Sequence, residues 1–212
     1  MKYGTQRDGT DKFRPRGSED VARLVDENPL AWIFLQDPDG PFATAAPVRP
    51  SATEGQLTRL IGHVPRSGRM AACLKSPREA LLLFLGPHGY ISPSWMSDRT
   101  QAPTWNFTSA QFVAEIELVD DPSFLELHLR DLTAAMERER DRAWHIDEIG
   151  DRMQKLAARI VAFEARIICT QGRFKLGQDE RDQTYPEIVH GLELDGHSRL
   201  LQWMQRFNPD RS

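Results

Sequence analysis

The sequence predicts an α+β protein in which six or seven mainly antiparallel strands close around one core, with helices on the outside. Three observations predict this class. Some segments alternate apolar and polar residues, most clearly AQFVAEIELVD at 110–120, where Phe112, Ala114 and Ile116 face one way and glutamates the other. Turn signals such as DPDGP at 37–41 separate neighbouring segments closely enough for hairpins. A chain of 212 residues is long enough to bury one substantial core.

The first half of the chain predicts one helix followed by strands. Ser18 is a suitable N-cap for a helix over EDVARLVDEN, and the Asn28-Pro29 pair ends it. Alternating patterns and turns then predict three antiparallel strands, at 30–36, 42–48 and 56–64. A short helix is expected at 67–75, followed at 79–86 by a central strand that is apolar on both faces.

The second half alternates between strands and helices. After the strand at 110–120, Asp121-Pro122 is typical of a helix start, and the apolar face of that helix comprises Leu125, Leu129, Leu132 and Met136. The charges of MERERDRAW cancel and predict a solvated helix end. The inward face of a second helix is expected to comprise Ile149, Met153, Leu156 and Ile160. A strand at 162–170 and helices near 183–194 and 197–207 complete the chain.

These elements predict a flexible basic arm and one domain. Residues 1–16 carry five lysines and arginines against two aspartates, and we expect them to form the arm. Residues 17–208 are expected to form a single domain, with a helical insertion at about 121–160 and C-terminal helices.

Composition argues against several classes of protein. The net charge of −4 would repel nucleic acid over the molecule as a whole, so direct DNA binding is doubtful. The longest apolar run, Ala80 to Leu85, is far shorter than the roughly 20 residues of a membrane helix. The charged N-terminus does not resemble a signal peptide, which predicts a cytoplasmic protein. Cys73 and Cys169 are expected to be free thiols, because two cysteines support neither a disulfide framework nor a zinc site.

Three clusters at the ends of expected strands, at 62–69, 89–107 and 172–179, combine complementary chemistry. The cations that could neutralise a phosphate are Arg66, Arg69 and Lys175. The rings that could pack on a flat heteroaromatic system are Trp95 and Trp105. Neutral donors and acceptors for a polar ring edge are Thr104, Asn106 and Gln178. Together they predict a site for a phosphorylated aromatic cofactor.

The string GPHGYISPSW…PTWNF, which begins at Gly86, closely resembles the signature of the PaiB-type FMN-binding negative transcriptional regulators. The likeness extends from about Phe13 to about Leu192 and includes ENPLAWI, the GHV.R stretch, RAWHID and IVAFEARIICTQGRFKLGQ. The resemblance implies a split β-barrel of the FMN-binding type. It also implies a homodimer with FMN bound near the subunit interface.

The resemblance also assigns site residues. The family's Gly-His-x-x-Arg stretch falls on Gly62, His63 and Arg66, which are implied to lie near the phosphate. Its Pro-Thr-Trp-Asn motif places Thr104, Trp105 and Asn106 near the isoalloxazine ring, and its Lys-Leu-x-Gln motif falls on Lys175, Leu176 and Gln178. The long motif adds Tyr90, Ser92 and Trp95 to the implied cofactor site, whereas Arg69 is a candidate through its charge and not through the resemblance.

The chain departs from the family pattern inside this implied site. After Arg66 it has Ser67, Gly68 and Arg69 where the family has Ala-Asn-Pro. The family's His-Leu-Pro is replaced by Ala45, Ala46 and Pro47, a family histidine is replaced by Gln111, and residues around Gln178 become Gly177 and Asp179. The loop after Trp95 is also shorter than usual. These changes leave open a weaker flavin affinity or an altered ligand.

Three alternatives for the function follow from the sequence. The first is a flavin-dependent sensor or regulator; the sequence has no helix-turn-helix or zinc-finger pattern for direct DNA readout. The second is an FMN-dependent oxidoreductase that receives electrons from NAD(P)H, although no GxGxxG fingerprint is present. The third is a relative that has lost flavin or binds heme, with His63 or His88 as candidate ligands. No GxSxG or HExxH motif supports a hydrolase.

Overall fold

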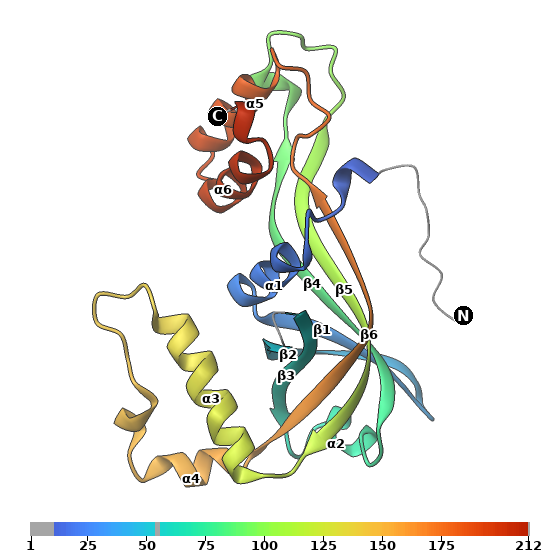
Figure 1. Ribbon diagram of the computed structural model, residues 1–212, viewed down its shortest axis with the longest axis vertical. Coiled ribbons are helices and arrows are strands. Elements are labelled where there is room, and N and C mark those ends of the chain that lie inside the picture. The colour runs from blue at the N-terminus through green and yellow to red at the C-terminus, as the bar shows by residue number, and fades with distance from the viewer. Residues whose placement is uncertain (1–10, 54–55, 212) are drawn as a thin grey trace.

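The computed structural model describes residues 11–53 and 56–211 and shows a closed antiparallel barrel with helices around it (Figure 1). The strand order around the barrel is β1-β2-β3-β6-β5-β4. The strands are β1 (Leu30–Asp37), β2 (Gly40–Thr53), β3 (Gln56–Pro65), β4 (Arg78–Ile91), β5 (Thr104–Val119) and β6 (Ile160–Lys175). The predicted α+β fold with a mainly antiparallel barrel is confirmed.

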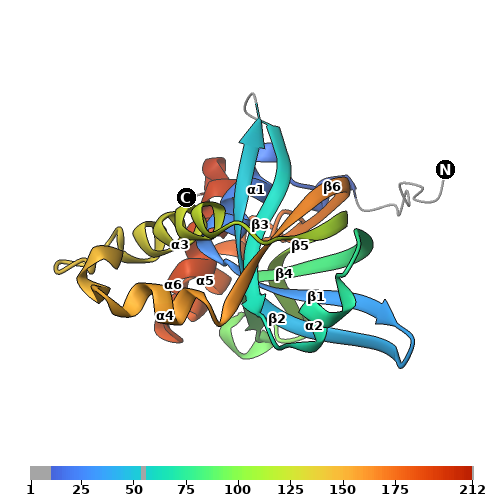
Figure 2. The same cartoon turned by 90° about the horizontal axis from the view of Figure 1, so that it is seen from below.

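Helices occupy three regions outside the barrel. The helices are α1 (Ser18–Glu27), α2 (Arg69–Cys73), α3 (Pro122–Glu137), α4 (Arg152–Ala157), α5 (Tyr185–Leu194) and α6 (Ser198–Phe207). Short 3₁₀ turns are η1 (Asp11–Phe13), η2 (Pro93–Trp95), η3 (Ile146–Ile149) and η4 (Pro209–Arg211). Figure 2 shows α2 beside the β1–β2 hairpin, with α3 and α4 on the other side of the barrel. No helix among the described residues combines the length and hydropathy needed to cross a membrane.

The barrel core follows the alternation read from the sequence. Phe112, Ala114 and Ile116 of β5 are fully buried, and Phe112 packs edge to face on Phe84 of β4 with ring centroids 5.6 Å apart. Aromatic pairs in this arrangement add packing energy beyond the apolar area that they bury. The predicted inward face of β5 is therefore confirmed.

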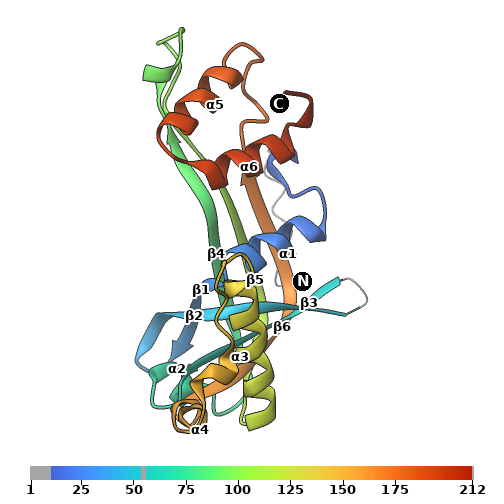
Figure 3. The same ribbon diagram turned by 90° about the vertical axis from the view of Figure 1, so that its left-hand side faces the viewer.

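Three strands continue beyond the barrel as a long arm made of the ends of β4, β5 and β6 (Figures 1 and 3). One face of the arm is covered by α5 and α6, and Phe174 of β6 stacks on Phe207 of α6 with centroids 5.5 Å apart. The indole Nε1 of Trp203 in α6 donates to Glu27 of α1 at 2.9 Å. The C-terminal helices therefore belong to the same packed unit as α1 and the sheet.

The strand predicted at 79–86 continues beyond its expected end. β4 continues through Pro87 as far as Ile91, and β5 begins at Thr104, so only 92–103 lies between the two strands. The β4–β5 register shifts between Leu85 and His88, where Pro87 lies. Proline is tolerated in a strand at such a bulge because its missing N–H need not join the ladder. The proline therefore did not end the strand.

The helical insertion also differs from the prediction. The second predicted helix consists instead of η3, the short helix α4, and a strand that starts at Ile160. Gly150 has φ 57°, a backbone conformation that ends the 3₁₀ turn and that glycine adopts readily. On α3, Leu125 and His128 are the buried residues, whereas Met136 is 40% exposed. The predicted leucine face is therefore correct mainly in its first turn.

The described part of the predicted basic arm is attached to the domain. Phe13 is buried, and the Arg16 guanidinium donates to the carbonyl oxygens of Arg206 and Phe207. Residues 1–10 of the predicted arm lie outside the described residues. The cysteines Cys73 and Cys169 are free thiols, as expected.

Candidate functional site

The first predicted cluster lies where β3 leaves the barrel, and its glycine has a packing role. A Cβ atom on Gly62 would lie 2.4 Å from the ring of Phe163 and 2.7 Å from the carbonyl oxygen of Pro47. Real side chains do not reach such distances, so only glycine lets β3 approach its neighbours here. Gly62 therefore shapes the barrel and presents no side chain to a cofactor.

His63 points out of the barrel and is covered by α3. Its Nδ1 lies 3.0 Å from Nε2 of His128, a buried residue of α3 that sequence reasoning missed. Burial lowers the pKa of His63. The pKa of His128 is lowered from 6.5 to about 4, mainly by burial and to a smaller extent by the nearby His63. The pair is therefore neutral near pH 7. The only sequence signal for His128 was its position one helical turn after Leu125.

A buried arginine reinforces the attachment of α3. Nε of Arg49 on β2 donates to Asp131 of α3 at 2.8 Å, and its Nη1 lies 2.6 Å from a carboxylate oxygen of Asp26 on α1. Nδ1 of His128 has no hydrogen-bond partner among the described residues. The contact between α3 and the barrel thus contains one satisfied ionic cluster and one unsatisfied imidazole nitrogen.

Arg66 follows β3 and presents its guanidinium group at the surface. Its Nη1 and Nη2 donate to the two carboxylate oxygens of Asp120 at 3.0 and 2.8 Å, and its backbone N–H donates to the carbonyl oxygen of Arg159. These hydrogen bonds from Arg66 lower the pKa of Asp120. The ion pair borders a cavity of about 220 Å³ that is also lined by Ser67, Gly68, Ala71, Ala72, Leu118 and Val161.

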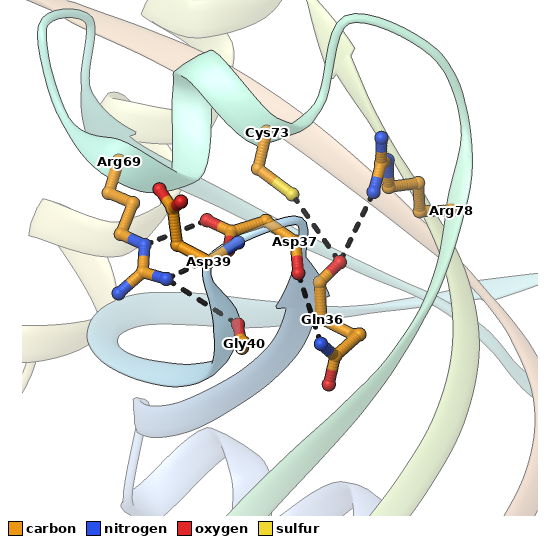
Figure 4. A network of polar contacts seen from close by, with 7 residues as sticks. All are labelled: Gln36, Asp37, Asp39, Gly40, Arg69, Cys73 and Arg78. Carbon is orange, nitrogen blue, oxygen red and sulfur yellow. Dashed lines mark hydrogen bonds and ion pairs between the residues drawn. The ribbon is translucent and has the colours of Figure 1, made fainter.

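Arg69 was predicted to join Arg66 at a phosphate, but it is directed at a different group (Figure 4). Its Nε and Nη2 each donate to Asp37 at 2.8 Å, and its guanidinium stacks over Phe42 at 4.3 Å from the ring centroid. The hydrogen bond from Arg69 is the largest of the contacts that lower the pKa of Asp37. Arg69 therefore ties α2 to the β1–β2 hairpin.

The rest of that network holds the same hairpin in place (Figure 4). The carbonyl oxygen of Gln36 accepts from Arg78 Nη1 at 3.1 Å and from Cys73 Sγ at 3.9 Å. Arg69 is thus paired with Asp37 on the β1–β2 hairpin, whereas Arg66 is paired with Asp120 after β5, so the two guanidinium groups are directed at different carboxylates.

The second and third clusters meet at the far end of the arm. Trp105 is 54% exposed, and its ring lies beside Tyr90 and His88, with centroids 5.9 and 6.3 Å away. Lys175 Nζ donates to Thr104 Oγ1 in the adjacent strand. The surface formed by the exposed rings of Tyr90 and Trp105 is called the aromatic platform below.

Other predicted residues at this end are used within the fold. Asn106 is fully buried on the opposite face of the sheet, where its amide nitrogen lies 3.6 Å from the sulfur of Met204. Both ends of the Gln178 amide bond the backbone, at Leu176 N and Phe174 O. The fold also uses Trp95, which packs closely against Gly191 of α5, and Ser92, which caps η2. These four side chains are therefore held by contacts within the fold, although the side-chain oxygen of Asn106 has no hydrogen-bond partner among the described residues.

Arg66 and the aromatic platform lie at opposite ends of β6. Pro65 pairs with Ile160 at the first residue of this strand, and Lys175, its last residue, pairs with Phe107 near Trp105. β6 has 16 residues, which at about 3.3 Å per residue correspond to roughly 50 Å of strand. A single mononucleotide cannot reach both ends, so the prediction that these loops converge in one pocket is wrong for a single chain.

The outer surface of β1 and β4 lies between these ends and is unusually apolar. On β1, Leu30, Trp32 and Phe34 are 64%, 55% and 40% exposed, and Leu85 of β4 is 58% exposed. Trp32 and Leu83 are direct partners in the β1–β4 ladder, so the exposed groups form one strip. Contiguous apolar surfaces of this kind mark interaction sites in soluble proteins.

Known proteins resemble this chain in sequence and fold. The family described as "Putative FMN-binding domain" matches residues 10–168. The Bacillus subtilis "Protease synthase and sporulation protein PAI 2" is 23% identical, covering 90% of this chain and 91% of its own length. An uncharacterized protein of Aspergillus fumigatus is 28% identical, covering 83% of this chain and 87% of its own length.

Solved structures confirm the split-barrel fold. The flavocytochrome Anf3 of Azotobacter vinelandii has a TM-score of 0.57 at 20% identity, covering 82% of this chain and 76% of its own. The FAD and heme binding protein of Mycobacterium smegmatis also has a TM-score of 0.57, at 18% identity, covering 84% of this chain and 80% of its own. With its family match, its PAI 2 relative and this fold, the chain belongs to the PaiB-type FMN-binding domain family, whose cofactor is FMN.

Proposed function

We propose that the protein is a homodimeric, FMN-dependent sensor or regulator in which each FMN lies across the subunit interface. In this arrangement Arg66 of one subunit binds the phosphate, and the aromatic platform of the partner subunit packs on the isoalloxazine ring. The observation that carries the proposal is the position of Arg66 and Trp105 at opposite ends of one sheet, with the apolar strip between them.

The phosphate end fits the chemistry of FMN. Arg66 already binds the two oxygens of a carboxylate in a bidentate pair, and the same fork of N–H groups matches two oxygens of a phosphate. The adjoining cavity of about 220 Å³ provides space beside this guanidinium. Arg66 is therefore placed to hold a dianionic phosphate at the end of the barrel.

The other end fits a flat, partly polar ring. Trp105 and Tyr90 expose aromatic surface, and the ammonium group of Lys175 on the neighbouring strand β6 donates to Thr104. Offset stacking on an exposed indole is a favourable way to hold a tricyclic ring. When bound, FMN supplies a redox-active ring whose chemistry belongs to the cofactor, while the protein binds and orients it.

A twofold dimer would bring the two ends together. A twofold axis that lies along the surface of the apolar strip, perpendicular to the arm, packs the strips of the two subunits against each other and makes their arms antiparallel. Arg66 of each subunit would then face the arm of its partner, and Trp32 and Leu85 would lose contact with water. Burial of this strip would stabilise the dimer and complete two equivalent FMN sites.

Mixed dimers test this arrangement. Arg66→Ala and Trp105→Ala each remove one half of every FMN site, so each homodimer should bind FMN weakly. A dimer with one substitution in each subunit retains one intact site, and we expect half of the normal FMN stoichiometry at normal affinity. A dimer with both substitutions in the same subunit retains no intact site. Equal FMN binding by the two kinds of mixed dimer would refute a site shared between subunits.

The regulatory role and its alternatives need separate measurements. Oxidation of NAD(P)H by the FMN-loaded protein, compared with free FMN, tests the oxidoreductase alternative. Salt-dependent binding in a mobility-shift assay tests direct DNA recognition. For the heme alternative, the candidate ligands are His63, whose Nδ1 lies near His128 under α3, and His88, whose Nδ1 lies near the carbonyl oxygen of Gly86. A flavin spectrum without a Soret band in the purified protein would exclude heme as its resident cofactor.

A further inference from the structure

A second cavity lies on the other side of the Arg66–Asp120 ion pair. Its volume is about 380 Å³, within the range of small-molecule pockets. It lies between the first turn of α3, the helix α4 and the ends of β5 and β6. We call it the insertion groove. Its lining is mainly apolar and includes Val119, Pro122, Leu125, Met153, Ala157 and Val161.

Arg66 and Asp120 line both cavities. The Asp120 carboxylate accepts hydrogen bonds from Nη1 and Nη2 of the Arg66 guanidinium. A phosphate that takes both donors of Arg66 must displace this carboxylate. If Arg66 binds the FMN phosphate as proposed above, FMN therefore leaves Asp120 charged and unpaired at the edge of the insertion groove.

The other charged groups around the groove are already engaged. Asp121 caps α3 by accepting from the backbone N–H groups of Ser123 and Phe124. Glu126 accepts from Arg130 at 2.8 and 3.0 Å. When phosphate displaces Asp120 from Arg66, Asp120 is therefore the one charged group of the groove that loses its partner. Its uncompensated carboxylate makes the edge of the apolar groove more negative.

We propose that the insertion groove binds a small organic cation, with an apolar body and one ammonium group, and that the ammonium pairs with the Asp120 released by FMN. The apolar body lies against Leu125, Met153 and Ala157 of the groove. Because coupling between two binding sites is reciprocal, FMN strengthens cation binding and the cation strengthens FMN binding by the same factor. The Arg66–Asp120 pair is then the element that links a flavin to a second ligand, as a sensor requires.

Matched probes test the proposal by fluorescence titration of FMN. 4-Phenylbutylammonium should raise the affinity for FMN by roughly twofold to fivefold, the equivalent of one exposed ion pair. 4-Phenylbutanol and 4-phenylbutyrate share the apolar body without the positive charge and should not raise it. An equal effect of all three probes, or no effect of the ammonium probe, would overturn the proposal.

Substitutions locate the effect. Asp120→Asn frees Arg66, so FMN should bind roughly twofold to fivefold more tightly without the probe, and the probe should lose its effect. Ala157→Phe fills the groove and should abolish the probe effect while FMN affinity is retained; Ala158→Phe provides a second filling variant on an exposed position. Lys155→Phe on the same helix lies outside the groove and is the matched control. A probe effect that survives in Asp120→Asn or in both filling variants would exclude this site.

These measurements separate the inference from the function on which it rests. If Arg66→Ala leaves the affinity for FMN unchanged, the proposed phosphate site is wrong. If Arg66→Ala weakens FMN but Asp120→Asn does not strengthen it, the phosphate site stands and the displacement of Asp120 is wrong.

Discussion

The contact between His63 and His128 predicts a specific loss of stability in mild acid. In the folded protein the pKa of His128 is lowered to about 4 because the ring is buried and lies beside His63. In the unfolded chain it returns to about 6.5. Between these values the unfolded state binds the extra proton, so the free energy of unfolding falls as the pH decreases from 6.5 towards 4.

The size of the effect follows from the two pKa values. They differ by roughly 2.5, and each unit corresponds to about 1.4 kcal/mol, so complete protonation removes about 3 kcal/mol. Between pH 7 and pH 5 the contribution of His128 alone is about 2 kcal/mol. The group is almost fully buried, at 4% exposure, so solvent screening reduces this value little. The charged neighbours of His128, Arg49 and Asp131, form an ion pair with each other. Their opposite effects on the pKa of His128 therefore partly cancel.

Urea unfolding at pH 7 and pH 5 measures this difference. In His128→Leu, which cannot take up the proton, we expect the decrease between the two pH values to be smaller by about 2 kcal/mol. The comparison uses the change with pH, because the substitution also removes the hydrogen bond to His63 at both values. His190→Gln, at an exposed position of α5, is the control and should retain the full decrease. An unchanged pH dependence in His128→Leu would show that this buried imidazole is not responsible.

Three further predictions concern the cofactor, the dimer and the barrel. Arg66→Ala should weaken FMN binding by about 1.5–3 kcal/mol in a fluorescence titration, the scale of a charge-assisted hydrogen bond; an unchanged dissociation constant would remove Arg66 from the phosphate site. Trp32→Glu places a charge in the apolar strip and should give monomers in sedimentation, whereas Leu194→Glu, on a more exposed but distant leucine, should not. Gly62→Ala should lower the free energy of unfolding by about 1–3 kcal/mol, because its Cβ would overlap the ring of Phe163; wild-type stability in urea would contradict this packing role.

Much of the fold could be predicted because its signals are local. The alternation of Phe112, Ala114 and Ile116 is a consequence of the twofold period of a strand, and the structure buries all three. Asp121-Pro122 predicts a helix start, and Asp121 does accept from the first free N–H groups of α3. The second predicted helix is much shorter than its helical apolar spacing indicates, because Gly150 at φ 57° ends the preceding 3₁₀ turn and pairing with β3 starts the strand at Ile160.

For the candidate site, less could be predicted from the sequence than for the fold. The sequence by itself determined which residue types are present, a guanidinium at Arg66 and an indole at Trp105, and it determined the family through their motifs. Only the tertiary structure decided their roles, because strand register turns Asn106 inward and Trp105 outward at adjacent positions. Only the tertiary structure also placed Arg66 against Asp120 and far from Trp105, because the length of β6 separates the two ends of the sheet.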